Sequence, residues 1–152
     1  MTDPVTFAST TPRHGLPVLF PGQAQKEVTL NEALARIDAL VHPAVQGIAD
    51  APPADPGEGE SWLVSTTPSG AWSGEAETLA TYQSGNWLFM APVPGMKVFD
   101  VHSGVQWIFA DRWQRSNPIA APSGGTSADT QARAAIVELI AALELAGVLP
   151  AA

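Results

Sequence analysis

Short apolar runs separated by turn residues fill the middle of the chain. Between Ser61 and Arg115, β-branched and aromatic residues recur in brief runs, each bounded by glycine, proline, serine or asparagine. Runs of this length and spacing are typical of an antiparallel meander, in which consecutive strands pair through short turns. The predicted strands are 61–65, 78–82, 87–90, 96–101 and 105–109.

A weak internal repeat accompanies these runs. Three Ser-Gly pairs each stand shortly before a tryptophan, and glycine adopts the positive φ that a tight hairpin turn requires. We therefore expect a hairpin turn at each pair. The pairs are 69–70 before Trp72, 84–85 before Trp87 and 103–104 before Trp107.

A helix is predicted upstream of the strands. Thr29 and Glu32 have the spacing of a capping box, which starts a helix, and Pro43 would end it. Apolar residues then recur at helical spacing, and a helix this short needs that face covered by its own domain or by another copy of the chain. The predicted stripe consists of Leu30, Ala33, Leu34, Ile37, Leu40 and Val41.

A second helix is predicted within residues 127–152. Ser127 or Asp129 would serve as its N-cap, and Gly147 follows its last turn. The central part of this helix carries only two charges, both glutamates. Such an apolar surface would be adhesive if exposed, so the helix packs either on another subunit or across its own small sheet.

Segments rich in proline and glycine separate the predicted elements. Residues 1–22 have too many of these residues for a regular helix and are interpreted as an extended arm. Residues 51–60 form an acidic spacer or broad loop. The resulting division is an arm (1–22), a helix and β domain (23–115), a linker (116–126) and a C-terminal helix (127–152). The fold class is α+β and mainly β: a short helix in the N-terminal half, a small Trp-rich antiparallel β meander and a C-terminal helix.

Composition narrows the classes of partner. The 152 residues include 15 acidic and 7 basic side chains, for a net charge of −8. Nucleic acid and anionic membranes repel such a surface, and no apolar run is long enough to cross a bilayer. Without cysteine there is neither a disulfide nor a thiolate metal site. We expect no nucleic-acid binding, no membrane insertion, no metal and no cofactor.

Candidate catalytic groups are few. Asp100 and His102 stand two residues apart on a predicted strand, so their side chains share one face and could polarise each other or hold a metal. Two ligands are too few for a metal site, and a solvent-facing turn pair beside Ser103 is the simpler interpretation. The sequence has no glycine-rich phosphate loop, no Gly-x-Ser-x-Gly elbow and no His-Glu-x-x-His segment. We therefore expect a protein that is not an enzyme.

The 5 tryptophans and the single tyrosine all lie in the β region. Indole rings stack on sugar rings and anchor protein interfaces, but a small sheet also uses them as its core. The core interpretation is favoured for Trp87 because apolar residues follow it. Trp72 and Trp113 have polar, turn-like surroundings, which predicts that they are exposed. The candidate glycan-binding residues are Trp72, Trp113, Tyr82 and Trp62.

One segment resembles a known family. Residues 21–41, with Gln-Ala-Gln-Lys at 23–26 and Asn-Glu-Ala-Leu at 31–34, are similar to the opening motif of DUF2793, a family of unknown function found in virion proteins of tailed phages, prophages and gene transfer agents. The Gly-Trp segments also resemble small chitin-binding-type modules, and residues 129–147 resemble terminal helices of phage fibre and spike proteins. The similarity to DUF2793 covers residues 15–115 and continues through Pro52-Pro53, Pro56-Gly57-Glu58-Gly59, Gly70-Ala71-Trp72, Gly85-Asn86-Trp87 and Pro94-Gly95-Met96.

The resemblance implies a non-enzymatic structural component of a phage-like particle, such as a head spike, a tail fibre or an adaptor at its base. Such a protein is assembled in the bacterial cytoplasm and carried in the virion, with capsid or fibre subunits and further copies of itself as partners. The alternative is a carbohydrate-binding module that recognises a host surface polysaccharide. The candidate oligomer and assembly contacts are Leu16, Leu19, Phe20, Gln23, Gln25, Lys26, Ile136, Leu139, Ile140 and Leu143.

Overall fold

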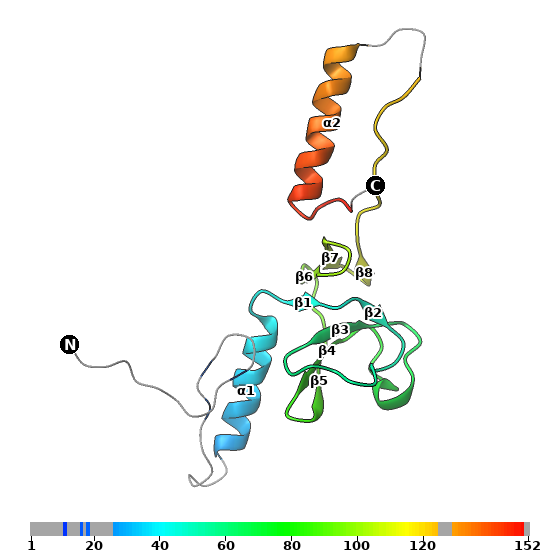
Figure 1. Cartoon of the computed structure of the whole chain (residues 1–152). Coiled ribbons are helices and arrows are strands. Elements are labelled where there is room, and N and C mark those ends of the chain that lie inside the picture. Colours follow the sequence, from blue (N-terminus) through cyan, green and yellow to red (C-terminus); the bar gives the residue numbers. More distant parts are fainter. Residues whose placement is uncertain (1–10, 12–15, 17, 19–25, 125–128, 151–152) are drawn as a thin grey trace, which may run out of the picture. The chain divides into compact units, whose positions relative to one another are not determined.

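The computed structural model describes residues 11, 16, 18, 26–124 and 129–150 (Figure 1). These residues form two α-helices, one short 3-10 helix and eight β-strands in two four-stranded mixed sheets. The fold is α+β and mainly β, as the hydrophobic pattern predicts. The chain divides into two compact units, the first made of residues 1–43 and 48–91 and the second of residues 44–47 and 92–152.

The first unit holds one sheet. Its strands are β2 (Ile48–Ala49), β3 (Ser61–Val64), β4 (Leu79–Gln83) and β5 (Asn86–Met90). They lie in that order across the sheet, with β2 parallel to β3 and the other neighbours antiparallel. The two-residue turn between β4 and β5 has φ of 52° at Ser84 and 76° at Gly85. Two positive values define a type I′ turn, so the predicted Ser-Gly hairpin is confirmed at this position.

The acidic segment 51–60 is a broad loop between β2 and β3. Its end is held against β4, because the amide of Gly59 donates to the Tyr82 carbonyl at 2.8 Å and the amide of Tyr82 donates to the Glu60 carbonyl at 2.9 Å. The carboxylate of Glu58 accepts a hydrogen bond from the amide of Ser84 at 2.8 Å. The loop is therefore part of the first unit and extends the pairing of β3 with β4.

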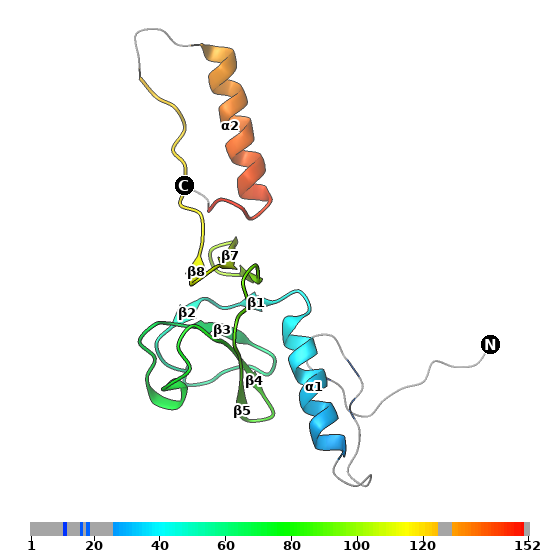
Figure 2. The same ribbon diagram turned by 180° about the vertical axis from the view of Figure 1, so that it is seen from behind.

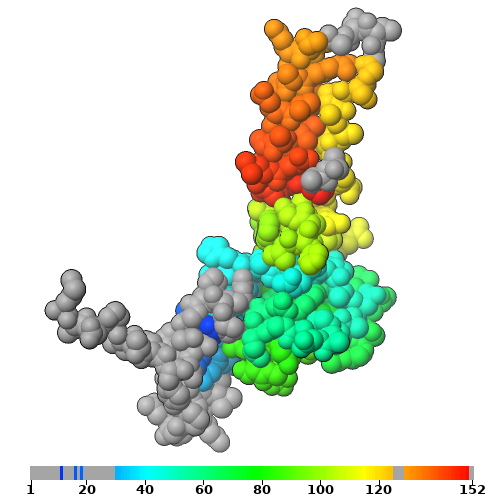
Figure 3. Space-filling view, viewed as in Figure 1, coloured from blue at the N-terminus to red at the C-terminus, as the bar shows by residue number. Residues whose placement is uncertain are grey.

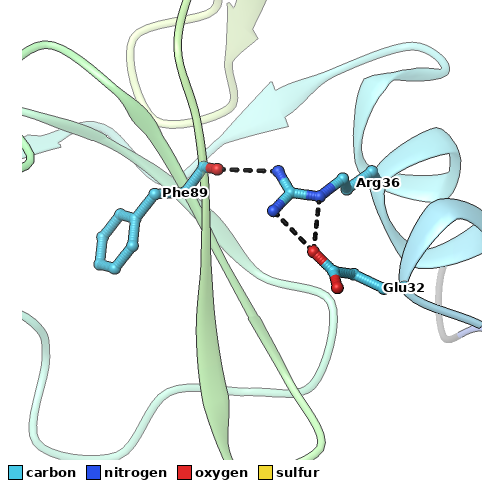
Figure 4. Close-up of polar contacts among 3 residues, drawn as sticks. All are labelled: Glu32, Arg36 and Phe89. Atoms are coloured by element: carbon cyan, nitrogen blue, oxygen red, sulfur yellow. Dashed lines mark hydrogen bonds and ion pairs between the residues drawn. The ribbon is translucent and has the colours of Figure 1, made fainter. Parts of the chain in front are cut away.

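The helix α1 (Lys26–Leu40) packs in the first unit through small residues. Ala35 and Ala39 are buried. Figure 4 shows how Arg36 fixes the helix: its Nη1 donates to the carbonyl oxygen of Phe89 on β5 at 2.9 Å, and its Nε and Nη2 donate to Oε1 of Glu32 at 3.0 and 2.8 Å. The alanines allow close approach, and the arginine supplies a directional bond to the strand.

Two expectations about this helix are wrong. It begins at Lys26, so Thr29 lies within the helix and is not its N-cap, and Glu32 pairs with Arg36. The predicted apolar stripe is also not the buried side, because the Arg36 bond and the alanines turn a different face inward. Four members of the stripe are exposed large apolar residues: Leu30, Ile37, Leu40 and Val41.

The second unit repeats the strand order of the first. Its strands are β1 (Ala44–Val45), β6 (Lys97–Asp100), β7 (Val105–Phe109) and β8 (Trp113–Gln114). β1 is parallel to β6, and β7 and β8 follow as antiparallel neighbours. Figure 2 shows β7 beside β8. The single predicted meander is thus two sheets. Pro92 and Pro94 follow β5 and have no amide hydrogen to donate, so strand pairing is interrupted there.

The remaining Ser-Gly pairs differ in structure. Gly104 has a φ of 69° and ends the turn between β6 and β7, as predicted. Gly70 has a φ of 61° but begins the 3-10 helix η1 (Gly70–Trp72), so the predicted hairpin at this pair is wrong. A Ser-Gly pair indicates where the chain turns, but the length of the loop around it decides whether two strands meet.

The helix α2 (Thr130–Leu145) has the predicted ends. Oδ1 of Asp129 accepts hydrogen bonds from the amides of Gln131 and Ala132, both at 3.0 Å, which makes Asp129 the N-cap. At the other end Gly147 has a φ of 67°, and the amide of Val148 donates to the Leu143 carbonyl at 2.9 Å. This bond is the signature of a Schellman motif, which ends a helix at a left-handed glycine.

Candidate binding surfaces

Aromatic side chains gather on one face of the first unit's sheet. Trp62, Trp72 and Trp87 contact one another, with ring centroids 6.4 Å (62–72), 5.6 Å (62–87) and 5.0 Å (72–87) apart. Tyr82 lies 5.1 Å from Trp87. Strand register places them together, because Trp62 pairs with Ala80 and Tyr82 pairs with Trp87 across neighbouring strands. We call Trp62, Trp72, Tyr82 and Trp87 the aromatic cluster.

Trp72 is the buried centre of this cluster. It is 0% exposed and packs against Val64 and Ala80. Within the described residues its Nε1 has no hydrogen-bond acceptor. Trp113, in the second unit, is 9% exposed and lies 5.3 Å from Phe109. The expectation that Trp72 and Trp113 are exposed is therefore wrong, because polar neighbours in a turn do not determine to which side the turn directs its indole.

The other three members of the cluster are half-buried. Trp62 and Tyr82 were predicted as ligand contacts, and Trp87, interpreted as core, shares their face and their partial exposure. The sequence contains a feature that predicts the position of Trp87. A two-residue hairpin turn at 84–85 places Trp87 opposite Tyr82. Partly exposed aromatic rings that pack against buried apolar residues can stack on a flat apolar ligand surface.

The N-terminal arm contacts α1 at one described point. Oγ1 of Thr11 donates to Oδ1 of Asp38 at 2.7 Å, and both residues are buried. The amide of Leu16 donates to Oγ1 of Thr11 at 3.0 Å, which places Leu16 beside this bond, half-buried. The other predicted contacts of this region, Leu19, Phe20, Gln23, Gln25 and the side chain of Lys26, lie outside the described residues.

The helix α2 presents apolar side chains to solvent. Ile136 and Leu139 are exposed, Leu139 by 59%, and Ile140 and Leu143 are half-buried. None of its residues is buried. Figure 3 shows the yellow segment before residue 125 along one side of the orange-to-red helix, where Arg133 donates hydrogen bonds to the carbonyl oxygens of Pro122 and Gly124.

Asp100 is a buried carboxylate that organises the turn after β6. Its Oδ1 accepts from the amides of His102 at 2.9 Å and Ser103 at 3.1 Å, and its Oδ2 accepts from Nε1 of Trp107 at 3.3 Å. Burial alone raises the pKa of Asp100, but the hydrogen bonds from Ser103, Trp107 and His102 outweigh it, so the pKa lies below its ordinary value. His102 contacts the carboxylate through its backbone, and its side chain is exposed. This geometry is the turn pair, the simpler interpretation of Asp100 and His102.

A comparison with known families identifies the domain. The model of the family described as protein of unknown function (DUF2793) matches residues 30–114, more than half of the chain. The chain belongs to the DUF2793 family. A search of curated proteins finds no match to it.

The DUF2793 match includes most of α1 and both sheets. The aromatic cluster and Asp100 therefore lie inside the family region, whereas α2 lies outside it. Neither helix has the length and hydropathy needed to cross a membrane, as far as the described residues extend. Over the same residues, no three histidine or acidic side chains are grouped as metal ligands would be.

Proposed function

We propose that this DUF2793 protein is a non-enzymatic structural component of a phage-like particle, a head-spike, fibre or adaptor subunit that attaches to other virion proteins. The apolar surface of α2 carries the proposal. A 16-residue helix is marginally stable alone, and helices in proteins gain most of their stability from packing an apolar face. Because no residue of α2 is buried, the packing that supports this helix is best supplied by another subunit.

The residues of α2 are arranged as such a contact requires. At 100° per residue, Ile136, Leu139 and Leu143 fall on one side of the helix, and Ala141 falls on the opposite side, between the exposed Val137 and Leu145. The exposed Leu30 and Ile37 of α1, with Val41 just after the helix, form an apolar strip in the first unit as well. Exposed apolar surfaces of this kind mark sites of protein contact. The resemblance of the first helix to virion proteins suggests which class of protein is contacted.

The test is incorporation into particles. A tagged chain is expressed in a bacterium that carries the gene for this protein and releases phage-like particles, and the particles are separated on a density gradient. The chain is expected to sediment with the particles, and Leu139→Glu is expected to leave it in the unassembled fraction. Ala141→Glu adds the same charge to the opposite side of the helix and should be incorporated normally.

Two results would contradict the proposal. One is a wild-type chain that never sediments with particles and remains monomeric by light scattering at high micromolar concentration. The other is equal incorporation of both glutamate variants, which would remove α2 from the contact. Circular dichroism of each variant checks that α2 is still formed, because a lost helix would imitate a lost contact.

The second candidate function is binding of a host surface polysaccharide, and the half-buried rings of Trp62, Tyr82 and Trp87 favour it. Titration with purified capsule or cell-wall glycans should change the tryptophan fluorescence of the wild-type chain. Tyr82→Ala should weaken that response, because the ring is half-exposed and its loss leaves the buried Trp72 in place. Absence of a response to host glycans would reject this candidate and leave the structural role intact.

A further inference from the structure

The second unit's sheet has one buried face and one exposed face. Side chains alternate between the two faces along β6, β7 and β8. On one face Val98, Asp100, Val105 and Trp113 are buried. On the other face the strand residues are all exposed, and strand register places them side by side. We call these residues the open face: Lys97, Phe99, Gln106, Ile108 and Gln114.

The open face contains an apolar groove. Phe99 and Ile108 are 40% and 42% exposed. A cavity of about 350 Å³ lies beside Ile108, and Val148, which follows α2, lines it as well. The amide of Gln106 donates to the carbonyl of Gly147 at 2.8 Å, which holds Val148 in place. The groove is therefore large enough to receive aliphatic side chains from a partner.

The equivalent face of the first unit's sheet is covered by a helix. Leu63 on β3 and Phe99 on β6 occupy equivalent positions, because each pairs with the first residue of its parallel two-residue strand. Leu63 is 0% exposed. The buried Ala35 of α1 lines a cavity together with Leu88, which strand register places on the same face as Leu63. A helix thus completes this face in the first unit, which suggests what kind of element fits the open face.

The helix α2 has an apolar side available for such a contact. Its Arg133 donates to the carbonyl oxygens of Pro122 and Gly124, so this side of the helix faces its own chain. Leu139 lies about 120° around the helix from Arg133 and is 59% exposed. Because α2 is held beside its own residues 122–124 and is tied at Gly147, a partner for the Leu139 side is best supplied by another chain.

The charges of the two surfaces are complementary. Lys97 is the charged residue of the open face, in a chain whose net charge is −8. The charged residues of α2 are Arg133, Glu138 and Glu144. Glu138 borders the Leu139 side, whereas Arg133 is bonded to carbonyl oxygens of its own chain. Opposite charges beside matching apolar surfaces favour a contact and fix its orientation.

We propose that the open face binds α2 of a second copy of this chain. Ile136 and Leu139 enter the groove beside Ile108, and Glu138 lies near Lys97. Each chain has one such helix and one open face, so two copies that exchange helices form two identical contacts and close a twofold dimer. The inference rests on the proposed function, which assigns α2 to a subunit contact, and it names the partner.

Engineered disulfides test the contact, because the sequence contains no cysteine. Purified Ile108→Cys and Leu139→Cys chains with tags of different length are mixed under reducing conditions and then oxidised. The expected product is the mixed disulfide dimer. Val93→Cys is the control partner for Leu139→Cys, since Val93 is 63% exposed and lies outside the strands. It should give at least about tenfold less product, because a disulfide requires Cβ atoms within about 4.5 Å.

Light scattering measures the dimer without a covalent link. Ile108→Glu should raise the dimer dissociation constant by at least about tenfold, because it places a charge in the groove. Val93→Glu adds the same charge outside the open face and should leave the constant within about twofold. Lys97→Glu should weaken the dimer by about threefold, and adding Glu138→Lys to it should restore the affinity. Circular dichroism checks that each variant keeps its helices and strands.

Several outcomes would overturn the inference. A Leu139→Cys chain that links mainly to itself would show helices pairing with each other. A chain with both cysteines that closes a disulfide within the monomer would show its own α2 on the open face. A chain that stays monomeric and forms no mixed disulfide would reject the dimer. If it still enters particles, the proposed function survives, whereas a chain that dimerises in this way but never enters particles would reject that function alone.

Discussion

The two sheets have the same strand order, but at one equivalent position the first sheet has an apolar residue and the second has an acidic one. In each sheet a two-residue strand runs parallel to the first strand of a three-stranded antiparallel meander. The register matches residue by residue, because Ala49 pairs with Val64 in the first unit and Val45 pairs with Asp100 in the second. In each unit the amide of the following residue donates to a carbonyl of the parallel strand. Ser65 donates to Ala49 and Val101 donates to Val45, each at 3.0 Å.

The loop that follows explains the difference between Val64 and Asp100. In the first unit the long segment 65–78 bonds its own amides, for example Trp72 to the carbonyl of Ser69, and brings an indole onto Val64. In the second unit the short turn 101–104 leaves amides without backbone acceptors, and the Asp100 carboxylate accepts two of them. The same topology thus accommodates an apolar side chain where the loop supplies an indole, and a buried carboxylate where the turn supplies amide donors.

Replacing Val64 by aspartate, the residue type at the equivalent position of the second sheet, should have the largest effect on stability. Val64→Asp places a carboxylate at a 1% exposed position against the indole of Trp72. Nε1 of Trp72 is one donor without an acceptor among the described residues, whereas Asp100 receives hydrogen bonds from two amides and an indole. We expect a loss of about 3 kcal/mol or more in the unfolding free energy of the first unit, the cost of burying a charge with too few hydrogen bonds. Hydrogen exchange should show loss of protection in residues 61–90 and retained protection in residues 97–114.

A matched control is available in the same chain. Val93→Asp makes the identical substitution at a residue that is 63% exposed and should change stability by less than about 0.5 kcal/mol. If Val64→Asp lowered protection equally in both sheets, the two units would unfold together. That result would contradict the view that each sheet is stabilised by its own centre.

Much of the fold is predictable because it depends on local patterns. Alternating apolar runs predict the long strands, Asp129 and Gly147 predict the ends of α2, and the pair 84–85 predicts its hairpin. The division into two sheets is not predictable in this way, because the parallel strands β1 and β2 have only two residues each and carry no periodic signal. The face that α1 buries also depends on a distant partner, the carbonyl of Phe89.

The candidate sites were less predictable than the strands. Sequence reasoning selected Trp72 by its polar neighbours, yet burial is decided by η1, which directs that indole into the sheet. It also missed that Lys97, Ile108 and Gln114 lie side by side on one face of the second unit's sheet, because these residues are far apart along the chain and meet only through strand register. Residues that act together across strands become visible only when the pairing is known.

A smaller effect is expected from neutralising the buried charge. Asp100→Asn keeps the size of the side chain but loses charge-assisted bonds to the amides of His102 and Ser103, at a cost of about 1–3 kcal/mol near neutral pH. Because the native pKa of Asp100 lies below the ordinary value of 3.8, its stabilising contribution is present above pH 3.8 and is lost as the pH falls through the native pKa.

Urea unfolding at several pH values checks this prediction. The wild type and Asp100→Asn should differ most near neutral pH and converge in acid, where the wild-type carboxyl is also protonated. Hydrogen exchange should confine the loss to residues 97–114. A constant difference at all pH values would mean that the shape of the side chain, not its charge, stabilises the turn.

The smallest expected effect comes from the two turn glycines, which should behave alike although their sheets differ. Gly85 and Gly104 have φ of 76° and 69°, and an added Cβ would meet nothing within 4 Å at either position. Alanine at each should therefore cost about 1 kcal/mol, from backbone conformation alone. Asparagine, which tolerates the left-handed region better, should cost less at both. Urea unfolding, with hydrogen exchange for each sheet, measures the two costs. Unequal costs would show that the residues around each turn also affect the stability of its backbone conformation.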